Sequence, residues 1–211
     1  MYTLYYMPGA ASLAVHWLLI ELDVPHRLVK LDGQAREQKS PEYLRLNPNG
    51  LVPTLVVDGE PVYESAALLL LLAERHAEKG FVPAEGTRAR ALYLQWMVHF
   101  ANTLMPPFRS WFYPDEAAGP EHAETVKAFA RGRIEATWDR LDAHLRDHGP
   151  WVAGAAGPTA VDFLGTMLAR WSRNMPRPAT EWPAIAALVQ RMKARPSFRE
   201  LYAREGLTEW A

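Results

Sequence analysis

The spacing of apolar residues in the first part of the chain changes between two periods. Thr3–Tyr6 and His26–Lys30 are short runs typical of strands, whereas the apolar residues between them recur at intervals of three and four and predict a helix over Ser12–Leu22. Two further β-runs meet at Asp58-Gly59, a pair typical of a hairpin turn, and a helix follows over Ser65–Glu78. The order βαβ, short helix, ββα predicts a small mixed sheet whose parallel pair is joined by a right-handed crossover.

After the segment Gly80–Gly86, which we interpret as a linker, the pattern is helical throughout. We therefore expect an α/β domain over residues 1–79, a linker over 80–86 and an all-helical domain over 87–211. Thr159, followed three residues later by Asp162, predicts a capping box at the start of one of the helices. The predicted helices of this part span residues 88–108, 121–147, 159–173, 183–194 and 197–204.

Composition and charge exclude several classes of function. The 211 residues carry a formal net charge of −1, which gives no reason to expect a nucleic-acid or anionic-membrane partner. The longest apolar run, Ala66–Ala73, is far shorter than the roughly 20 residues that cross a bilayer. The N-terminal residues lack the layout of a signal peptide, so we expect a cytoplasmic protein. Cysteine is absent, which excludes disulfides, thiolate metal sites and a protein thiol as nucleophile, and no histidine pattern predicts a metal.

The turn between the first strand and the first helix is a candidate anion site. Pro8-Gly9 breaks the strand, and the helix that follows directs unpaired backbone N–H groups toward the turn, where an anion or a thiolate is stabilised. The residues at this point are Ala10, Ala11 and Ser12, so the only reactive side chain is a hydroxyl.

Two other segments carry candidate binding groups. If the Val52-Pro53 bond is cis, the N–H and C=O of Val52 are free to pair with an extended ligand; if it is trans, Pro53 only starts a strand. Glu64 and Ser65 lie between a strand and a helix, where Ser65 is a natural N-cap. They either start the helix or form a clamp, in which the helix end holds a carboxylate and Glu64 pairs with an ammonium group.

The helix that follows is apolar on every face over Ala66–Ala73, whereas contact with a single core requires a stripe of only about 100°. A second buried face, against the helical part of the chain or against another subunit, accounts for this pattern. We therefore predict a symmetric dimer.

Four motifs, YYMPGAASLAVH, NPNGLVPTL, YESAALLLLLAE and GPTAVDF, together resemble the soluble glutathione S-transferases, and the first is most similar to the bacterial beta-type branch. They are spread over essentially the whole chain in the expected order. The resemblance implies an α/β plus all-α fold with a thioredoxin-like N-terminal domain, an all-helical C-terminal domain and a homodimer. It also implies that glutathione lies along the N-terminal domain and that a small electrophile binds between the domains.

The resemblance assigns glutathione-binding roles to three pairs of residues. The backbone of Val52, with Pro53 in the cis form, would pair with the cysteinyl unit, and Glu64-Ser65 would hold the γ-glutamyl end. Gln38 and Lys39 would contact the glycyl carboxylate. The sequence departs from the beta-type pattern at Ala11, where those enzymes carry a cysteine, so a mixed disulfide with glutathione is excluded and the thiolate of glutathione itself must be stabilised.

Two hydroxyl groups compete for that role. Ser12 is either an N-cap or a thiolate donor, and we place it slightly ahead of Tyr6, which matches a tyrosine of the beta-type enzymes. For the electrophile, Asn102, Met105 and Phe108 fall on a shared helical stripe. Arg109 either meets an anionic group there or is an ordinary surface arginine.

These residues predict a glutathione transferase that activates the glutathione thiol for attack on small, mostly apolar electrophiles, a reaction typical of detoxification, with some reduction of hydroperoxides by the same thiolate. Two alternatives stay open. One is a glutathione-binding or protein-interaction module of the same fold with little turnover, and the other is a glutathione-dependent reductase or isomerase.

Overall fold

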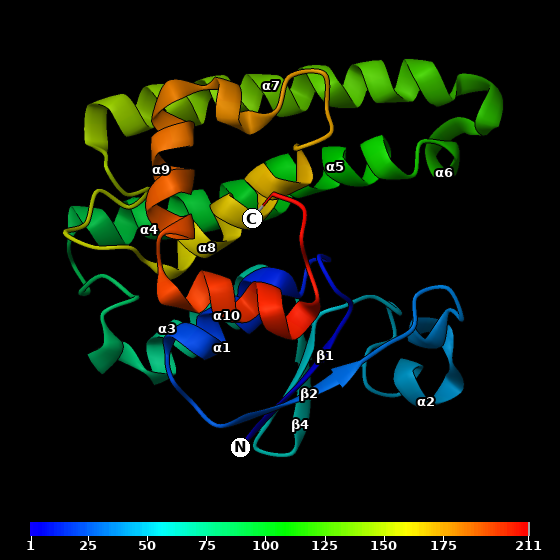
Figure 1. Cartoon of the computed structure of the whole chain (residues 1–211), viewed down its shortest axis with the longest axis horizontal. Coiled ribbons are helices and arrows are strands. Elements are labelled where there is room, and N and C mark those ends of the chain that lie inside the picture. Colours follow the sequence, from blue (N-terminus) through cyan, green and yellow to red (C-terminus); the bar gives the residue numbers. More distant parts are fainter. Residues whose placement is uncertain (211) are drawn as a thin grey trace. The chain divides into compact units, whose positions relative to one another are not determined.

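The computed structural model describes residues 1–210 and forms two compact units (Figure 1). The first unit consists of Met1–Val82 together with the chain from Lys193 onward, and the second consists of Pro83–Met192. The first unit therefore includes a C-terminal segment that the sequence placed in the helical domain.

A four-stranded mixed sheet forms the centre of the first unit. Its strands are β1 (Tyr2–Tyr6), β2 (His26–Lys30), β3 (Thr54–Val57) and β4 (Glu60–Tyr63), in the spatial order β2-β1-β3-β4. β1 and β2 are parallel, whereas β1 with β3 and β3 with β4 are antiparallel. The hairpin predicted at Asp58-Gly59 is confirmed, with Val57 opposite Glu60 and positive φ angles at both turn residues.

The helices of this unit are α1 (Leu13–Glu21), α2 (Pro41–Leu44), α3 (Ser65–Arg75) and α10 (Pro196–Glu205). α1 packs against both α3 and α10 (Figure 1). The thioredoxin-like arrangement predicted for the N-terminal part is confirmed. Two 3-10 turns complete the unit, over Glu37–Lys39 and Ala77–Lys79.

Side chains of β1 alternate between two cores, as a strand requires. Leu4 and Tyr6 are buried, and the ring of Tyr6 lies 5.7 Å from that of His16 on α1. Tyr5 points the other way, and its ring lies 5.7 Å from that of Tyr43 on α2. Tyr5 and Tyr6 therefore lie on opposite faces of the sheet.

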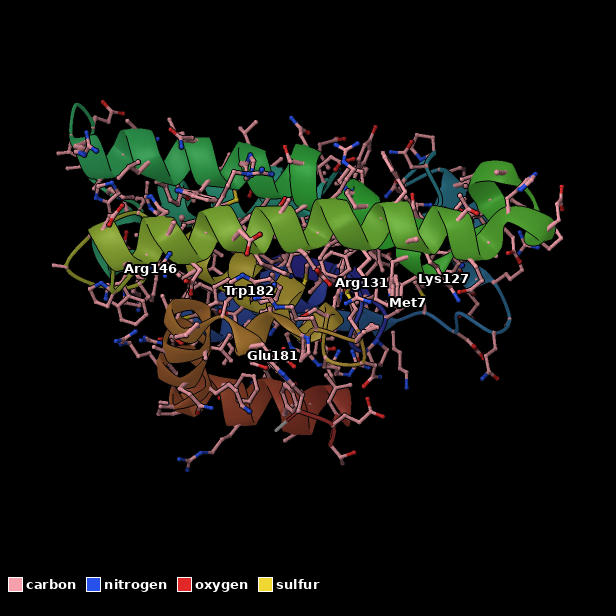
Figure 2. The ribbon with its side chains drawn as sticks, turned by 90° about the horizontal axis from the view of Figure 1, so that it is seen from above. Met7, Lys127, Arg131, Arg146, Glu181 and Trp182 are labelled. Atoms are coloured by element: carbon pink, nitrogen blue, oxygen red, sulfur yellow. The ribbon has the colours of Figure 1, made fainter. Side chains whose placement is uncertain are left out.

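The second unit is helical, as predicted. Its helices are α4 (Arg88–His99), α5 (Met105–Phe112), α6 (Asp115–Ala118), α7 (Ala123–His148), α8 (Ala160–Trp171) and α9 (Pro183–Lys193). α7 is shown along its length in Figure 2, with Lys127, Arg131 and Arg146 labelled on it. Trp182, labelled in Figure 2 just before α9, donates from Nε1 to the Asp139 carboxylate of α7 at 2.7 Å.

The single helix predicted over residues 88–108 is wrong in its end and in its continuity. A π-helical turn over Phe100–Leu104 links α4 to α5, and α5 continues to Phe112. Both prolines lie in the first turn of α5, where no intrahelical partner is needed for the missing N–H. Within residues 1–210 we find no helix long and apolar enough to cross a membrane.

The predicted capping box of α8 is confirmed. Its carboxylate, that of Asp162, also accepts a hydrogen bond from a residue outside the box. Asp162 is fully buried and accepts hydrogen bonds from the backbone N–H and the hydroxyl of Thr159, at 2.7 and 3.0 Å. Its second oxygen accepts the N–H of Val152 at 2.9 Å. Burial raises the pKa of the Asp162 carboxyl to about 6, although these three hydrogen bonds oppose the shift.

Because this folded-state pKa lies above the unfolded value, the carboxyl contributes most to stability below pH 4 and loses that contribution as the pH rises toward 6. The loss amounts to at most about 3 kcal/mol. We expect D162N to be less stable than the native protein at every pH, since its amide nitrogen would face an N–H donor. The difference between the two proteins should shrink between pH 4 and pH 6 in urea unfolding. A difference that grows with pH would contradict the assignment.

Candidate active site

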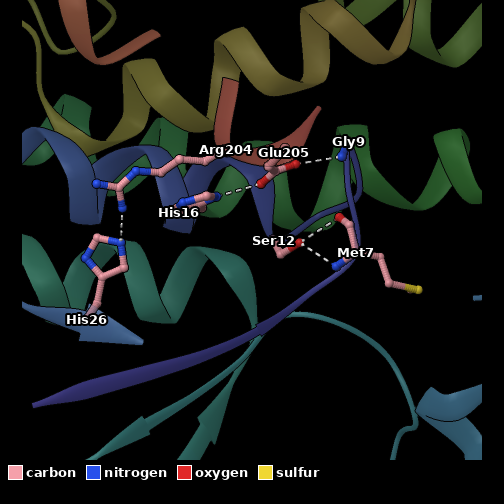
Figure 3. Close-up of polar contacts among 7 residues, drawn as sticks. All are labelled: Met7, Gly9, Ser12, His16, His26, Arg204 and Glu205. Atoms are coloured by element: carbon pink, nitrogen blue, oxygen red, sulfur yellow. Dashed lines mark hydrogen bonds and ion pairs between the residues drawn. The ribbon is translucent and has the colours of Figure 1, made fainter. Parts of the chain in front are cut away.

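The turn between β1 and α1 is closed by hydrogen bonds among its own residues (Figure 3). The carbonyl of Met7 accepts the N–H of Ala10 and the hydroxyl of Ser12, both at 3.2 Å. The N–H of Met7 in turn donates to the Ser12 hydroxyl oxygen at 3.3 Å. Gly9 takes a φ of 70°, a left-handed conformation that favours glycine at this point of the turn.

Ser12 occupies the N-cap position of α1, as one of the two interpretations predicted, but its side chain forms no capping hydrogen bond. The residue is fully buried and its hydroxyl closes the turn onto Met7 instead. Among residues 1–210, the backbone N–H groups of Ala11 and Ser12 donate to no other backbone group. These two amides are therefore available at the start of α1, where the helix dipole favours an anion.

Tyr6 lies at the end of β1, immediately before this turn. The residue is buried, and burial raises the pKa of its phenol, with a smaller contribution from the Glu205 carboxylate. The phenol is therefore a hydrogen-bond donor rather than a phenolate at neutral pH.

The start of α3 is attached directly to the turn. The hydroxyl of Ser65 donates to the carbonyl of Ala11 at 3.0 Å. The N-cap position of α3 is Glu64 rather than Ser65, so the cap predicted at Ser65 is wrong by one residue. Glu64 has a φ of 78°, which is uncommon for a residue with a side chain, and that side chain is exposed.

The Val52-Pro53 bond is cis. Among residues 1–210, the backbone of Val52 forms no hydrogen bond with another backbone group. Its side chain packs against Leu31 and Tyr43, in a cluster that also includes Met7 and Ala10 of the turn. The cis loop and the turn thus adjoin each other.

The side chains that hold the loop before Val52 were not predicted from the sequence. The Tyr43 hydroxyl and the Asn47 amide both donate to the carbonyl of Leu51, at 2.6 and 2.9 Å, and both also contact the Thr54 hydroxyl. Asn47 is 2% exposed. In the sequence, Asn47 stands out only as the first residue of the NPNGLVPTL motif.

Gln38 and Lys39 lie beside the same loop. The ammonium group of Lys39 donates to the carbonyl of Asn49 at 3.0 Å. A Cβ atom on Gly50 would come within 2.7 Å of the Lys39 side chain and 2.8 Å of the Gln38 carbonyl, so these segments are in close contact. The side-chain oxygen of Gln38 is buried without a hydrogen-bond partner.

A second group that the sequence did not reveal is a buried carboxylate from the last helix. Glu205 of α10 accepts the N–H of Gly9 at 2.8 Å and contacts Nδ1 of His16 at 2.8 Å (Figure 3). Glu205 is separated from these residues by 196 and 189 positions, so no local pattern links them.

The four residues expected at the electrophile lie in the second unit and do not share a face. Asn102 and Arg109 are exposed, Met105 is half-buried and Phe108 is fully buried. The stripe interpretation is wrong because the π-helical turn over Phe100–Leu104 shifts the register of the helix.

Phe108 belongs to the core of the second unit, where its ring lies 5.7 Å from Trp171 and 6.3 Å from Trp138. Arg109 pairs with Glu116 at 2.8 Å and lies over the ring of Tyr113. The arrangement of Arg109 is therefore that of an ordinary surface arginine.

In the first unit, the turn, the cis loop and the start of α3 thus come together, through the contacts of Ser65, Val52 and Ala11. This arrangement offers backbone groups for an extended peptide, helix N-termini for anionic groups and an exposed carboxylate for an ammonium group.

Known proteins are similar to this chain in sequence and in fold. A family model described as the N-terminal domain of glutathione S-transferases matches residues 10–75. Glutathione S-transferase GST-4.5 of Xanthomonas campestris is 34% identical over 97% of this chain and 98% of its own length. Glutathione S-transferase GstA of Escherichia coli O157:H7 is 30% identical over 97% of this chain and 98% of its own length.

A glutathione transferase homologue from Sulfitobacter, solved with bound glutathione, superposes with a TM-score of 0.89, 27% identity and 99% coverage of both chains. The two relatives that are 30% and 34% identical over nearly their whole length confirm the family that the four motifs resemble. The chain belongs to the glutathione S-transferase family.

Proposed function

We propose that this protein is a glutathione transferase that holds glutathione as a thiolate for attack on small, mostly apolar electrophiles. The observation that carries the proposal is the meeting of the β1–α1 turn, the cis Val52-Pro53 loop and the start of α3 in one unit. Because the chain has no cysteine, glutathione supplies the nucleophile.

The thiol must be activated by the turn. A free thiol has a pKa near 8.5, and lowering it by one unit requires about 1.4 kcal/mol of preferential binding of the thiolate. The N–H groups of Ala11 and Ser12 are suited to this because they lie at the N-terminal end of α1, where the helix dipole is positive. Because the turn already holds them in place, binding of the thiolate does not require them to reorient. Ser12 supports them by fixing Met7, and Tyr6 adds a protonated phenol nearby.

The same geometry supplies binding groups for the rest of glutathione. The free backbone of Val52 pairs with the cysteinyl unit, as a strand added to a sheet edge would. Glu64 binds the ammonium of the γ-glutamyl end, while Ser65 and the N-terminus of α3 hold its carboxylate. Lys39, with Gln38, lies on the side of the cis loop and supplies positive charge for the glycyl carboxylate.

For the electrophile, we propose that Asn102 and Met105 of the second unit contribute contacts, since both retain exposed surface. Phe108 contributes only through the core that supports them.

Glutathione titration by calorimetry, followed by turnover of a generic aryl halide, tests the proposal. Saturable binding with turnover is the expected result. Binding without turnover would instead indicate a glutathione-binding module, and absence of binding would refute both.

We expect E64Q to weaken glutathione binding about tenfold, because a charge-assisted hydrogen bond to the ammonium becomes a neutral one. The side chain of Glu64 is exposed, so folding should be unaffected. E60Q, which neutralises another exposed carboxylate in β4, is the matched control. Equal affinities of the two variants in calorimetry would remove Glu64 from the site.

We expect S12A to raise the pH at which turnover is half-maximal by about one unit, because the N–H of Met7 loses its acceptor and the turn loosens around the thiolate. Glutathione affinity should change little. Y6F should give a smaller shift, since Tyr6 adds a donor but does not close the turn. An unchanged pH profile in a folded S12A variant would exclude this role for Ser12.

We also propose that the protein is a homodimer. Leu70 and Leu71 of α3 stay partly exposed, and Leu94, Val98 and Phe129 expose apolar surface in the second unit. Phe129 is 69% exposed although the apolar pattern of α7 predicts it inside. We expect V98E to produce monomers in sedimentation velocity while Q95E, on the same helix, does not. A native protein that sediments as a monomer would refute the dimer.

A further inference from the structure

The buried carboxylate of Glu205 is placed where it can control the geometry of the active-site turn. Glu205 is the last residue of α10, and its side chain is completely removed from solvent. One carboxylate oxygen accepts the N–H of Gly9 at 2.8 Å, and the other contacts Nδ1 of His16 at 2.8 Å (Figure 3). One side chain therefore binds both the turn and the helix that follows it.

The two contacts have different consequences. The bond to His16 requires a proton on Nδ1 and fixes the carboxylate against α1, where His16 is fully buried. The bond to Gly9 fixes the peptide plane two residues before Ala11, whose N–H we assign to the thiolate. A buried carboxylate that accepts two charge-assisted hydrogen bonds is held in one position, because moving it would leave a buried charge without partners.

We propose that Glu205 is a positioning residue for glutathione activation, because it fixes the peptide at Gly9 and thereby aims the N–H groups of Ala11 and Ser12 at the thiolate. The Ser12 hydroxyl bonds to Met7 within the turn, and the Glu205 carboxylate of α10 accepts the N–H of Gly9. This inference rests on the proposed function.

The charged and titratable groups around Glu205 come from several elements. His16 lies on α1, and the buried phenol of Tyr6 lies on β1. Beyond His16, the ring of His26 on β2 lies 5.9 Å away and bonds to the guanidinium of Arg204 at 3.1 Å. Arg204 also pairs with Glu200 on the same helix.

The effect of Glu205 on geometry can be separated from the effect of its charge. E205D keeps the charge but shortens the side chain by one methylene, about 1.5 Å, so the carboxylate cannot reach both partners. E205Q removes the charge but keeps one oxygen to accept from Gly9, and its amide can donate to His16 Nδ1 when that ring carries its proton on Nε2. A role in positioning therefore predicts damage in E205D and rescue in E205Q.

Glu21 provides a matched control. It lies at the other end of α1 and also binds α10, through Arg195 and Ser197. E21D shortens a side chain that joins the same two helices but does not contact the turn. Both aspartate variants should lower the melting temperature, so stability alone does not distinguish them.

Two measurements on the full-length protein decide the inference. We expect E205D to speed amide hydrogen exchange at Gly9 by about tenfold or more, relative to E21D. We also expect it to raise the pKa of the bound glutathione thiol, followed by thiolate ultraviolet absorbance, by about half a unit or more. E205Q should bring both the Gly9 exchange rate and the pKa of the bound thiol most of the way back to their native values. Gly9 exchange and a thiol pKa in E205D equal to those in E21D would overturn the inference.

Failure of the proposed function gives a different result. If the native protein binds no glutathione, the proposed function and the thiol part of the inference are refuted. Gly9 exchange in E205D against E21D then still decides whether Glu205 holds the turn.

Discussion

Helix α1 is enclosed on every side, and the rest of the first unit is arranged around this constraint. From Leu13 to Leu19 no residue exposes more than 2% of its surface. Leaving a polar group of so buried a helix unpaired costs roughly 1–3 kcal/mol. Within residues 1–210, Nε2 of His16 is the one side-chain atom of α1 that is buried without a hydrogen-bond partner. The indole of Trp17 is satisfied by Ser197, and Glu21 by Arg195 and Ser197, all from α10 or the residue that precedes it. The free backbone N–H groups of Ala11 and Ser12 lie immediately before α1, and that is where the proposed thiolate lies.

In each unit a buried carboxylate accepts hydrogen bonds from backbone N–H groups that would otherwise be unpaired. Asp162 satisfies N–H groups at the start of α8, and Glu205 satisfies one in the turn before α1. In each case the carboxylate accepts donors that the local backbone leaves free. The difference lies in the distance along the chain: Asp162 reaches residues three and ten positions away, whereas Glu205 comes from the opposite end of the sequence.

That difference explains which features of the structure could be predicted from the sequence. The strands, the hairpin at Asp58-Gly59 and the Thr159–Asp162 box follow from patterns within a few residues, and all are observed. The π-helical turn over Phe100–Leu104 leaves no such pattern, because α7 and α8, two of the helices that it contacts, lie later in the chain. This turn displaced the stripe expected through Phe108. The motifs located the turn and the clamp, but only the structure shows that Ser12 bonds to Met7 rather than capping α1.

The return of the last helix to the first unit also affects how the chain matures. Domains generally fold as they leave the ribosome, with the N-terminal one first. Here α10 is synthesised after the whole second unit, so the partners of Trp17, Glu21 and His16 become available only then. The site for the reactive thiolate is thus completed last, after the helical unit that accompanies it has been synthesised.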